Sequence, residues 1–248
     1  MMIAFDYLII LGLVGFYLYD SAKLCFYNEF YLLNGFTAKF KSQMLVNHVS
    51  IFKKFLIIPQ PFCPHYLCFK VRWQLTHHQD HQQVADNEIG AILNLQKILK
   101  PLQPMIYLNT VLTLVLLPIA LIYKSSYLYL AILILSIYAI NLINITWIFV
   151  QRKQLYLSNL KFSYLFIDAL LCPPFALNLL QKISLNYDFK TDAITLSQHL
   201  LQADDFQALL SQTIADIELL KNNHDSEQLV IEQLTLKQNY LTNLLSPP

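Results

Sequence analysis

The chain has 248 residues, of which 56% are hydrophobic and only 13% are charged, and its mean hydropathy is +0.43. An ordinary soluble domain carries about 25% charged residues, so the composition argues against that class and indicates a membrane protein. The formal net charge of +1 leaves no excess of positive charge to follow a phosphate backbone, which argues against a nucleic-acid partner.

The first apolar stretch runs from Tyr7 to Tyr19 and has Asp6 and Asp20 at its ends. It lacks the basic segment and the small-residue cleavage site of a signal peptide. Residues 1–20 are therefore predicted to form a retained transmembrane anchor helix. Because the apolar length is marginal for a full crossing, an interfacial helix is the alternative.

Residues 21–76 are predicted to form a juxtamembrane cytosolic β-domain. Two strand-like runs, 24–33 and 36–45, flank Asn34-Gly35, which is a strong signal for a β-hairpin with a two-residue loop. That loop places Glu29 opposite Phe40 on an otherwise apolar face.

Glu29 is expected to pair with a lysine or to reach the sheet edge, and the alternative is an acid whose pKa is raised by burial. The alternating run from His65 to Leu75 and the apolar run from Phe52 to Ile58 complete a small antiparallel sheet. Lys70 and Arg72 share its polar face, which either meets solvent or attracts anionic lipid headgroups.

The four cysteines are irregularly spaced among apolar neighbours, as expected for reduced thiols in a cytosolic region. Cys63 and Cys68 lack zinc-knuckle spacing, so packing is the favoured interpretation. Only four glycines are present, which argues against glycine-rich phosphate loops.

The densest group of possible metal ligands is His77, His78 and His81, followed by Asp86 and Glu88. Imidazoles and carboxylates can bind zinc or iron. The histidines resemble one histidine box of membrane desaturases and hydroxylases. That family needs several boxes to hold two irons, whereas the remaining histidines of this chain are isolated.

The favoured interpretation of residues 77–105 is a polar linker followed by an amphipathic helix. Apolar residues recur at helical spacing from Ile89 to Leu99, and Pro101 is expected to end the helix.

Residues 106–153 are predicted to form a transmembrane hairpin. Its apolar runs, Ile106–Tyr123 and Tyr127–Val150, are each close to the roughly 20 residues that cross a bilayer. Nine Lys and Arg residues lie between Asp20 and Met105, but the hairpin tip carries Lys124 alone. The positive-inside rule therefore places the N-terminus outside and the middle and C-terminal regions in the cytosol.

Folding the hairpin about its tip brings Asn109 and Asn141 to the same depth, with Thr113 and Asn144 nearby. We expect a hydrogen bond between the two asparagines, worth about 0.6 kcal/mol by analogy with measured cases. A polar permeation path is the alternative. Neither run contains an ionisable Asp, Glu, Lys, Arg or His, which weakens a pump or transporter interpretation.

Residues 154–190 contain a fourth apolar stretch, Phe162 to Leu180, interrupted by Asp168 and by Pro173 with Pro174. Proline removes backbone hydrogen bonds, so a broken helix that is interfacial or re-entrant is expected. Asp168 requires a partner helix or exposure at the interface.

Residues 191–248 are predicted to form a cytosolic helical hairpin. One stripe steps by four and three and comprises Phe206, Leu210, Thr213, Ile217 and Leu220. After a polar turn, a second stripe comprises Val230, Leu234, Leu241 and Leu244.

The predicted fold is an integral membrane α+β protein with three transmembrane helices, a small antiparallel juxtamembrane sheet, a broken interfacial or re-entrant helix and a C-terminal helical hairpin. No catalytic residue, cofactor-binding residue, cofactor or metal ligand is assigned.

The expected function is that of a non-enzymatic accessory or scaffold subunit of an envelope complex in a bacterial inner membrane. Its partners would be membrane lipids and either another protein or a second copy, bound through the hairpin and the C-terminal helices. The alternatives are a metal-dependent membrane enzyme that uses His77, His78 and His81, and an oligomeric channel-forming or membrane-disrupting protein.

Overall fold

The computed structural model is a mixed, helix-dominant α+β fold and describes residues 5–37, 39–44, 50–51, 54–58, 62–75, 82–222 and 228–245. The chain divides into two compact units. The hairpin unit comprises Met1–Lys23, Ile58–Cys68 and Asn94–Asn186, and the sheet unit comprises Leu24–Ile57, Phe69–Leu93 and Tyr187–Pro248.

The chain from Gln82 to Ile122 is built from five helical elements that follow one another without an interruption. The α-helix over Gln82–Leu99 ends just before Pro101, as expected, but the chain stays helical, because this proline occupies the first turn of a 3-10 helix, where its missing N–H costs nothing. The elements are α2 (Gln82–Leu99), η2 (Lys100–Leu102), α3 (Gln103–Val111), η3 (Leu112–Leu116) and α4 (Leu117–Ile122).

The η3 segment is a π-helix, a widening of the helix that precedes Pro118 in the first turn of α4. A proline ring clashes with the carbonyl four residues earlier in a regular α-helix. The wider turn accommodates Pro118 within the helix, so the segment continues to Ile122.

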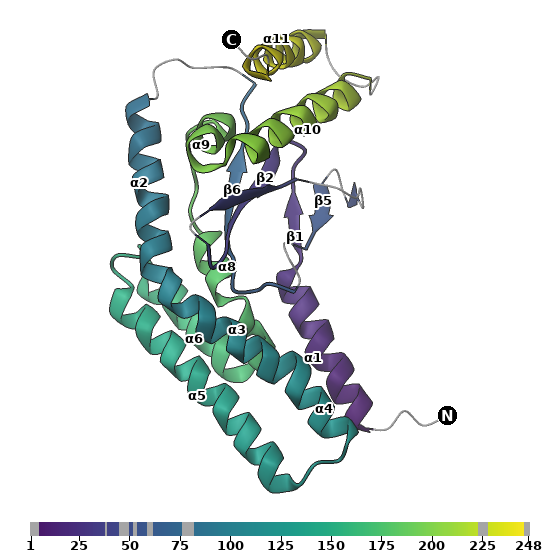
Figure 1. Ribbon diagram of the computed structural model, residues 1–248, viewed down its shortest axis with the longest axis vertical. Coiled ribbons are helices and arrows are strands. Elements are labelled where there is room, and N and C mark those ends of the chain that lie inside the picture. The colour runs from purple at the N-terminus through teal and green to yellow at the C-terminus, as the bar shows by residue number, and fades with distance from the viewer. Residues whose placement is uncertain are drawn as a thin grey trace. The chain divides into compact units, whose positions relative to one another are not determined.

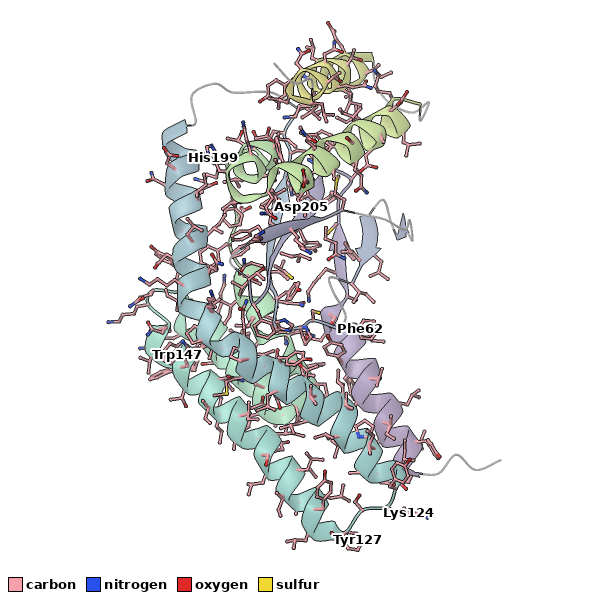
Figure 2. The ribbon with its side chains drawn as sticks, in the orientation of Figure 1. Phe62, Lys124, Tyr127, Trp147, His199 and Asp205 are labelled. Atoms are coloured by element: carbon pink, nitrogen blue, oxygen red, sulfur yellow. The ribbon has the colours of Figure 1, made fainter. Side chains whose placement is uncertain are left out.

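The tip of the hairpin joins α4 to α5 (Tyr127–Gln151). Lys124 adopts a left-handed conformation with φ of 48°, and the Ser125 N–H donates to the Ala120 carbonyl at 3.0 Å. This geometry caps the end of a helix. Ser126 begins α5 by accepting a hydrogen bond from the Tyr129 N–H. Figure 1 shows α3 and α4 antiparallel to α5, and Figure 2 shows Lys124 and Tyr127 at the tip.

Two helical segments are long and apolar enough to cross a membrane, residues 84–122 and 127–151. They give limited support to membrane association. Helix α1 (Phe5–Ser21) has 17 residues and is not one of the two, so the predicted third span remains a proposal.

The remaining part of the hairpin unit contains a broken helix, as predicted. Helix α6 (Asn159–Leu171) ends where Cys172 becomes extended, with φ of −135° and ψ of 90°. Helices α7 (Pro173–Leu177) and α8 (Leu179–Ser184) follow. Helix α1 packs against α4 and α7.

Two three-stranded sheets occur in the described residues, with strand orders β1-β5-β4 and β3-β2-β6. The pairs whose register is defined, β2 with β3 and β4 with β5, are antiparallel. The strands are β1 (Lys23–Cys25), β2 (Glu29–Asn34), β3 (Phe40–Gln43), β4 (Ser50–Ile51), β5 (Lys54–Ile57) and β6 (Leu67–Arg72).

The hairpin of β2 and β3 is present, but its predicted two-residue loop and register are wrong. Asn34 pairs with Phe40, so Glu29 does not lie opposite Phe40. The Asn34 side-chain amide donates to the carbonyls of Thr37 and Lys39, both at 3.2 Å, and these bonds stabilise a wider loop. All six residues of β2 are buried.

Helices α9 (Ala193–Leu200), α10 (Ala203–Asn222) and α11 (Gln228–Leu245) complete the sheet unit. Helix α10 packs against β3 and against α11, and Figure 1 shows α9 and α10 covering the sheet. In the two predicted apolar stripes, Leu210 and Ile217 of α10 and Leu234 and Leu241 of α11 are buried.

Candidate functional site

The first polar cluster lies between α3 and α5. The Asn109 side-chain amide donates to the side-chain oxygen of Asn141 at 2.6 Å, and both residues are buried. This contact confirms the sequence prediction. Thr113 and Asn144 lie one helical turn further along their helices and are also buried. We call these four residues the amide seam.

The amide seam has more hydrogen-bonding capacity than its neighbours use. Within the described residues, the Thr113 hydroxyl oxygen and both polar atoms of the Asn144 side chain have no partner, and neither has the Asn141 amide nitrogen. Buried polar groups are normally satisfied by protein or by ordered water. The seam can therefore hold water or hold helices together, but it offers neutral groups and no proton-transfer pair.

The second polar cluster joins α1, α6 and α8 in the hairpin unit. The Lys182 ammonium lies 3.0 Å from one Asp20 carboxylate oxygen and 3.1 Å from an Asp168 oxygen. Only 15% of the Lys182 side chain and 13% of the Asp20 side chain are exposed, whereas Asp168 keeps 45%. The partner expected for Asp168 is thus a lysine of the same chain. We call this group the ionic cluster.

Three further side chains complete the ionic cluster. The Asn178 amide donates to the second oxygen of Asp20 at 3.0 Å, and the Ser21 hydroxyl donates to the Asn178 oxygen at 3.2 Å. The Lys23 ammonium donates to the Asp20 carbonyl at 2.6 Å. Burial lowers the pKa of Lys23, and the Asp20 carboxylate partly opposes that shift.

Sequence reasoning singled out Asp168 but missed Asp20 and Lys182 as its neighbours. Asp20 looked like the end of an anchor helix, and Lys182 follows the break at Pro173 by nine residues. A signal was present, since an acidic residue within an apolar stretch requires a cation, and Lys182 is the first lysine beyond the break.

The third polar cluster surrounds Glu29 in the sheet unit. Its carboxylate lies 2.6 Å from the Arg72 guanidinium and 3.2 Å from the Lys70 ammonium, and it accepts the Phe26 N–H at 3.0 Å. The expected pairing with a lysine is confirmed. Burial alone would raise the pKa of Glu29, but the Phe26 N–H and the two cations outweigh it and hold that pKa below its ordinary value. The alternative of a raised-pKa acid is therefore wrong.

The two cations of this third cluster share the Glu29 carboxylate, and a second carboxylate lines the same cavity. Lys70 and Arg72 line a small cavity of about 210 Å³, together with Glu29 and Asp188. A site for anionic headgroups needs uncompensated positive charge. The local charges balance, which leaves little attraction for an anionic lipid.

The proposed metal ligands His77, His78 and His81 lie outside the described residues. Glu88 is described, and its carboxylate accepts the backbone N–H groups of Lys190 and Thr191, at 2.9 and 3.1 Å. No group of three possible metal ligands occurs in the part of the chain that the structure describes.

His65 and the four cysteines are described, and none of them belongs to a group of three possible metal ligands among the described residues. The His65 ring packs edge-on against the rings of Tyr66 and Tyr107, with centroids 4.7 and 5.3 Å away. Burial lowers the pKa of His65 to about 4. Cys63 and Cys68 are free thiols, and the latter is buried. These positions fit the packing interpretation.

Comparisons with known proteins return no relationship: no family model, no curated protein and no solved structure matches the chain.

Proposed function

We propose that the chain is an integral membrane protein that serves as a non-enzymatic accessory or scaffold subunit of a bacterial inner-membrane complex. The observation that carries the proposal is the exposure of its two long apolar helices. In each, only 33% of the most apolar 18-residue window is buried within the protein, whereas the core helix of a soluble protein is mostly buried. Such a surface needs lipid or partner helices to cover it.

The exposed side chains of α5 illustrate this requirement. Leu128 is 72% exposed, Leu135 71% and Val150 69%, so apolar surface continues along the helix. The side chains of Asn109, Asn141 and Asn144 are instead buried in the amide seam between α3 and α5. An apolar exterior with a polar interior suits a helix pair in lipid.

The proposed topology places the N-terminus outside and the sheet unit and C-terminal helices in the cytosol, with α1 as the third span. Lys124 is the only Lys or Arg at the hairpin tip, whereas Arg152 and Lys153 follow α5. Cytoplasmic flanks carry the excess of positive charge.

The proposed contact surface for a protein partner lies on the C-terminal helical hairpin. Leu219 of α10 is 58% exposed and Leu236 of α11 is 64% exposed. The Lys221 ammonium donates to the Gln238 side-chain oxygen at 2.9 Å, and this bond joins α10 to α11 two residues beyond each leucine. Exposed apolar side chains on two helices joined in this way suit a protein contact.

The test is site-specific photocrosslinking in intact cells. A photoreactive amino acid replaces Leu219 or Leu236, and matched controls carry it at the exposed positions Gln207 or Glu232 of the same helices. The proposal predicts one defined protein adduct from the leucine positions, recovered in constant ratio to the chain, and far less from the controls. Equal or no crosslinking at all four positions would overturn the scaffold role and favour a lone channel-forming protein or an enzyme.

A further inference from the structure

An apolar groove of about 410 Å³ lies between α1 and the break that separates α6 from α7. Leu8, Gly12 and Phe16 of α1 form one wall, and Leu171 and Pro173 contribute to the other. Its volume falls in the range of small-molecule sites, and its lining offers dispersion contacts without directional polar groups. An acyl chain matches these properties.

The groove adjoins the ionic cluster. The ring of Phe16, in the groove wall, packs edge-on against the Phe175 ring with centroids 6.1 Å apart. The Lys182 ammonium lies 5.0 Å from the centroid of that same Phe175 ring. Cys172 lines the groove and also lies within electrostatic range of Asp20, Lys182 and Asp168. An apolar slot thus leads to a group of charges.

The charges of that group balance. Asp20 and Asp168 are acidic, Lys23 and Lys182 are basic, and Asp168 keeps 45% of its side chain exposed. An anionic headgroup would bring a phosphate but no second ammonium for the partly exposed Asp168 carboxylate, of which one oxygen contacts Lys182. A headgroup that carries both a phosphate and a primary ammonium can satisfy both signs.

We propose that this groove and the ionic cluster form a binding site for a zwitterionic aminophospholipid of the phosphatidylethanolamine class. One acyl chain occupies the groove, the primary ammonium of the headgroup donates to Asp168, and the phosphate faces Lys182 and Lys23. A choline headgroup fits less well because its quaternary nitrogen has no N–H to donate. The inference rests on the membrane insertion proposed above.

The acyl-chain part is tested by native mass spectrometry of the purified full-length protein in detergent. The protein is equilibrated with equal amounts of phosphatidylethanolamine, phosphatidylglycerol and phosphatidylcholine of identical chains. Gly12→Leu fills the groove, whereas the matched control Gly15→Leu lies on the same helix outside it, and a Cβ at either glycine meets nothing within 4 Å.

The proposal predicts that one phosphatidylethanolamine remains bound to the parent chain and to Gly15→Leu, and that its retention falls at least fivefold in Gly12→Leu. Equal retention in the two glycine variants would overturn the groove as the site. Circular dichroism of both variants identifies any loss of folding that would invalidate the comparison, and Leu8→Trp then supplies a second way to fill the groove.

The headgroup part is tested with Asp168→Asn, which removes the exposed carboxylate. We expect the preference for phosphatidylethanolamine over phosphatidylglycerol to be lost, while total lipid retention persists. An unchanged preference in Asp168→Asn, or a preference for phosphatidylglycerol in the parent, would overturn the zwitterionic assignment. Carbonate extraction of membranes distinguishes a failure of membrane insertion from a failure of the lipid site. Release of the chain by carbonate would contradict membrane insertion itself. Retention of the chain in the membrane without a bound lipid would contradict only this site.

Discussion

The helix pair of α3 and α5 and the sheet unit differ in how fully their buried polar groups are hydrogen-bonded. In the amide seam, Asn109 and Asn141 share one hydrogen bond, and Asn144 makes none within the described residues. In the sheet unit, the buried carboxylate of Glu29 has two cations and a backbone N–H. A neutral amide that lacks a partner costs far less than an unpaired charge. The apolar span therefore tolerates incomplete bonding that the charged sites could not.

The largest loss of unfolding free energy is expected where a buried charged side chain would lose its only ion-pair partner among the described residues. The Lys237 side chain is 1% exposed, and its ammonium lies 2.7 Å from Asp192. Asp192→Asn leaves that ammonium unpaired, which we expect to lower the free energy of unfolding by about 3 kcal/mol.

This loss is measured by denaturant unfolding in detergent, followed by tryptophan fluorescence. The chain has two tryptophans, so a Trp147→Phe background leaves Trp73, in the sheet unit, as the only reporter. Replacing both partners, as Asp192→Asn with Lys237→Met, should recover most of the stability. A single variant as stable as the parent would show that the pair does not matter.

Removing the cation of the ionic cluster should lower the free energy of unfolding by less, because Asp168 is partly exposed. Lys182→Met leaves Asp20 and Asp168 without their shared cation, and we expect a loss of about 2 kcal/mol. Unfolding in mixed detergent micelles, followed by circular dichroism, measures the loss. The matched control Lys161→Met replaces an exposed lysine of α6 and should change stability by less than about 0.5 kcal/mol. Similar losses in both variants would contradict the role of the cluster.

His65 should make stability depend on pH. Its pKa is about 4 in the folded protein and about 6.5 when unfolded. Between these values the unfolded chain binds more protons, so stability falls as the pH falls from 6.5 to 4, with a slope of at most about 1.4 kcal/mol per pH unit. The difference in unfolding free energy between the parent and His65→Gln, measured across this range, should show that slope. A difference that does not vary with pH would contradict the burial of neutral His65.

The smallest changes in unfolding free energy are expected in the amide seam. They distinguish an asparagine that makes a side-chain hydrogen bond from one that makes none among the described residues. Asn109→Leu removes the bond to Asn141 and should cost about 0.6 kcal/mol. Asn144→Leu removes an amide that has no described partner, so it should be neutral or stabilising. Unfolding in mixed micelles compares the two. A larger loss for Asn144→Leu would show that water or another ligand satisfies that side chain.

Some of these contacts could be predicted from the sequence because simple geometry determines them. A three-residue tip and the rise per residue of a helix fix which residues share a depth, so the contact of Asn109 with Asn141 followed directly. The apolar stripes of α10 and α11 followed from helical periodicity in the same way.

Other features could not be predicted because single side chains decide them. The amide of Asn34 bonds two loop carbonyls and shifts the register of β2 and β3, although Asn34-Gly35 favours a tight turn. The pairing of Asp168 with Lys182 depends on the angle of the chain at Cys172, which no periodicity encodes. Local hydrogen bonds and helix breaks therefore limited the prediction of the candidate sites.

Thiol labelling at the two ends of α5 tests most directly whether the hairpin crosses the membrane. Tyr127→Cys lies at the hairpin tip, where Tyr127 is 92% exposed, and Gln154→Cys lies just beyond the other end, at an exposed position. A membrane-impermeant maleimide is added to intact spheroplasts, and the parent chain gives the background from the native cysteines. With the tip outside and the other end of α5 in the cytosol, we expect labelling of Tyr127→Cys in intact spheroplasts and of Gln154→Cys only after lysis. Labelling of both positions only after lysis, or of both before it, would contradict a hairpin that crosses the membrane.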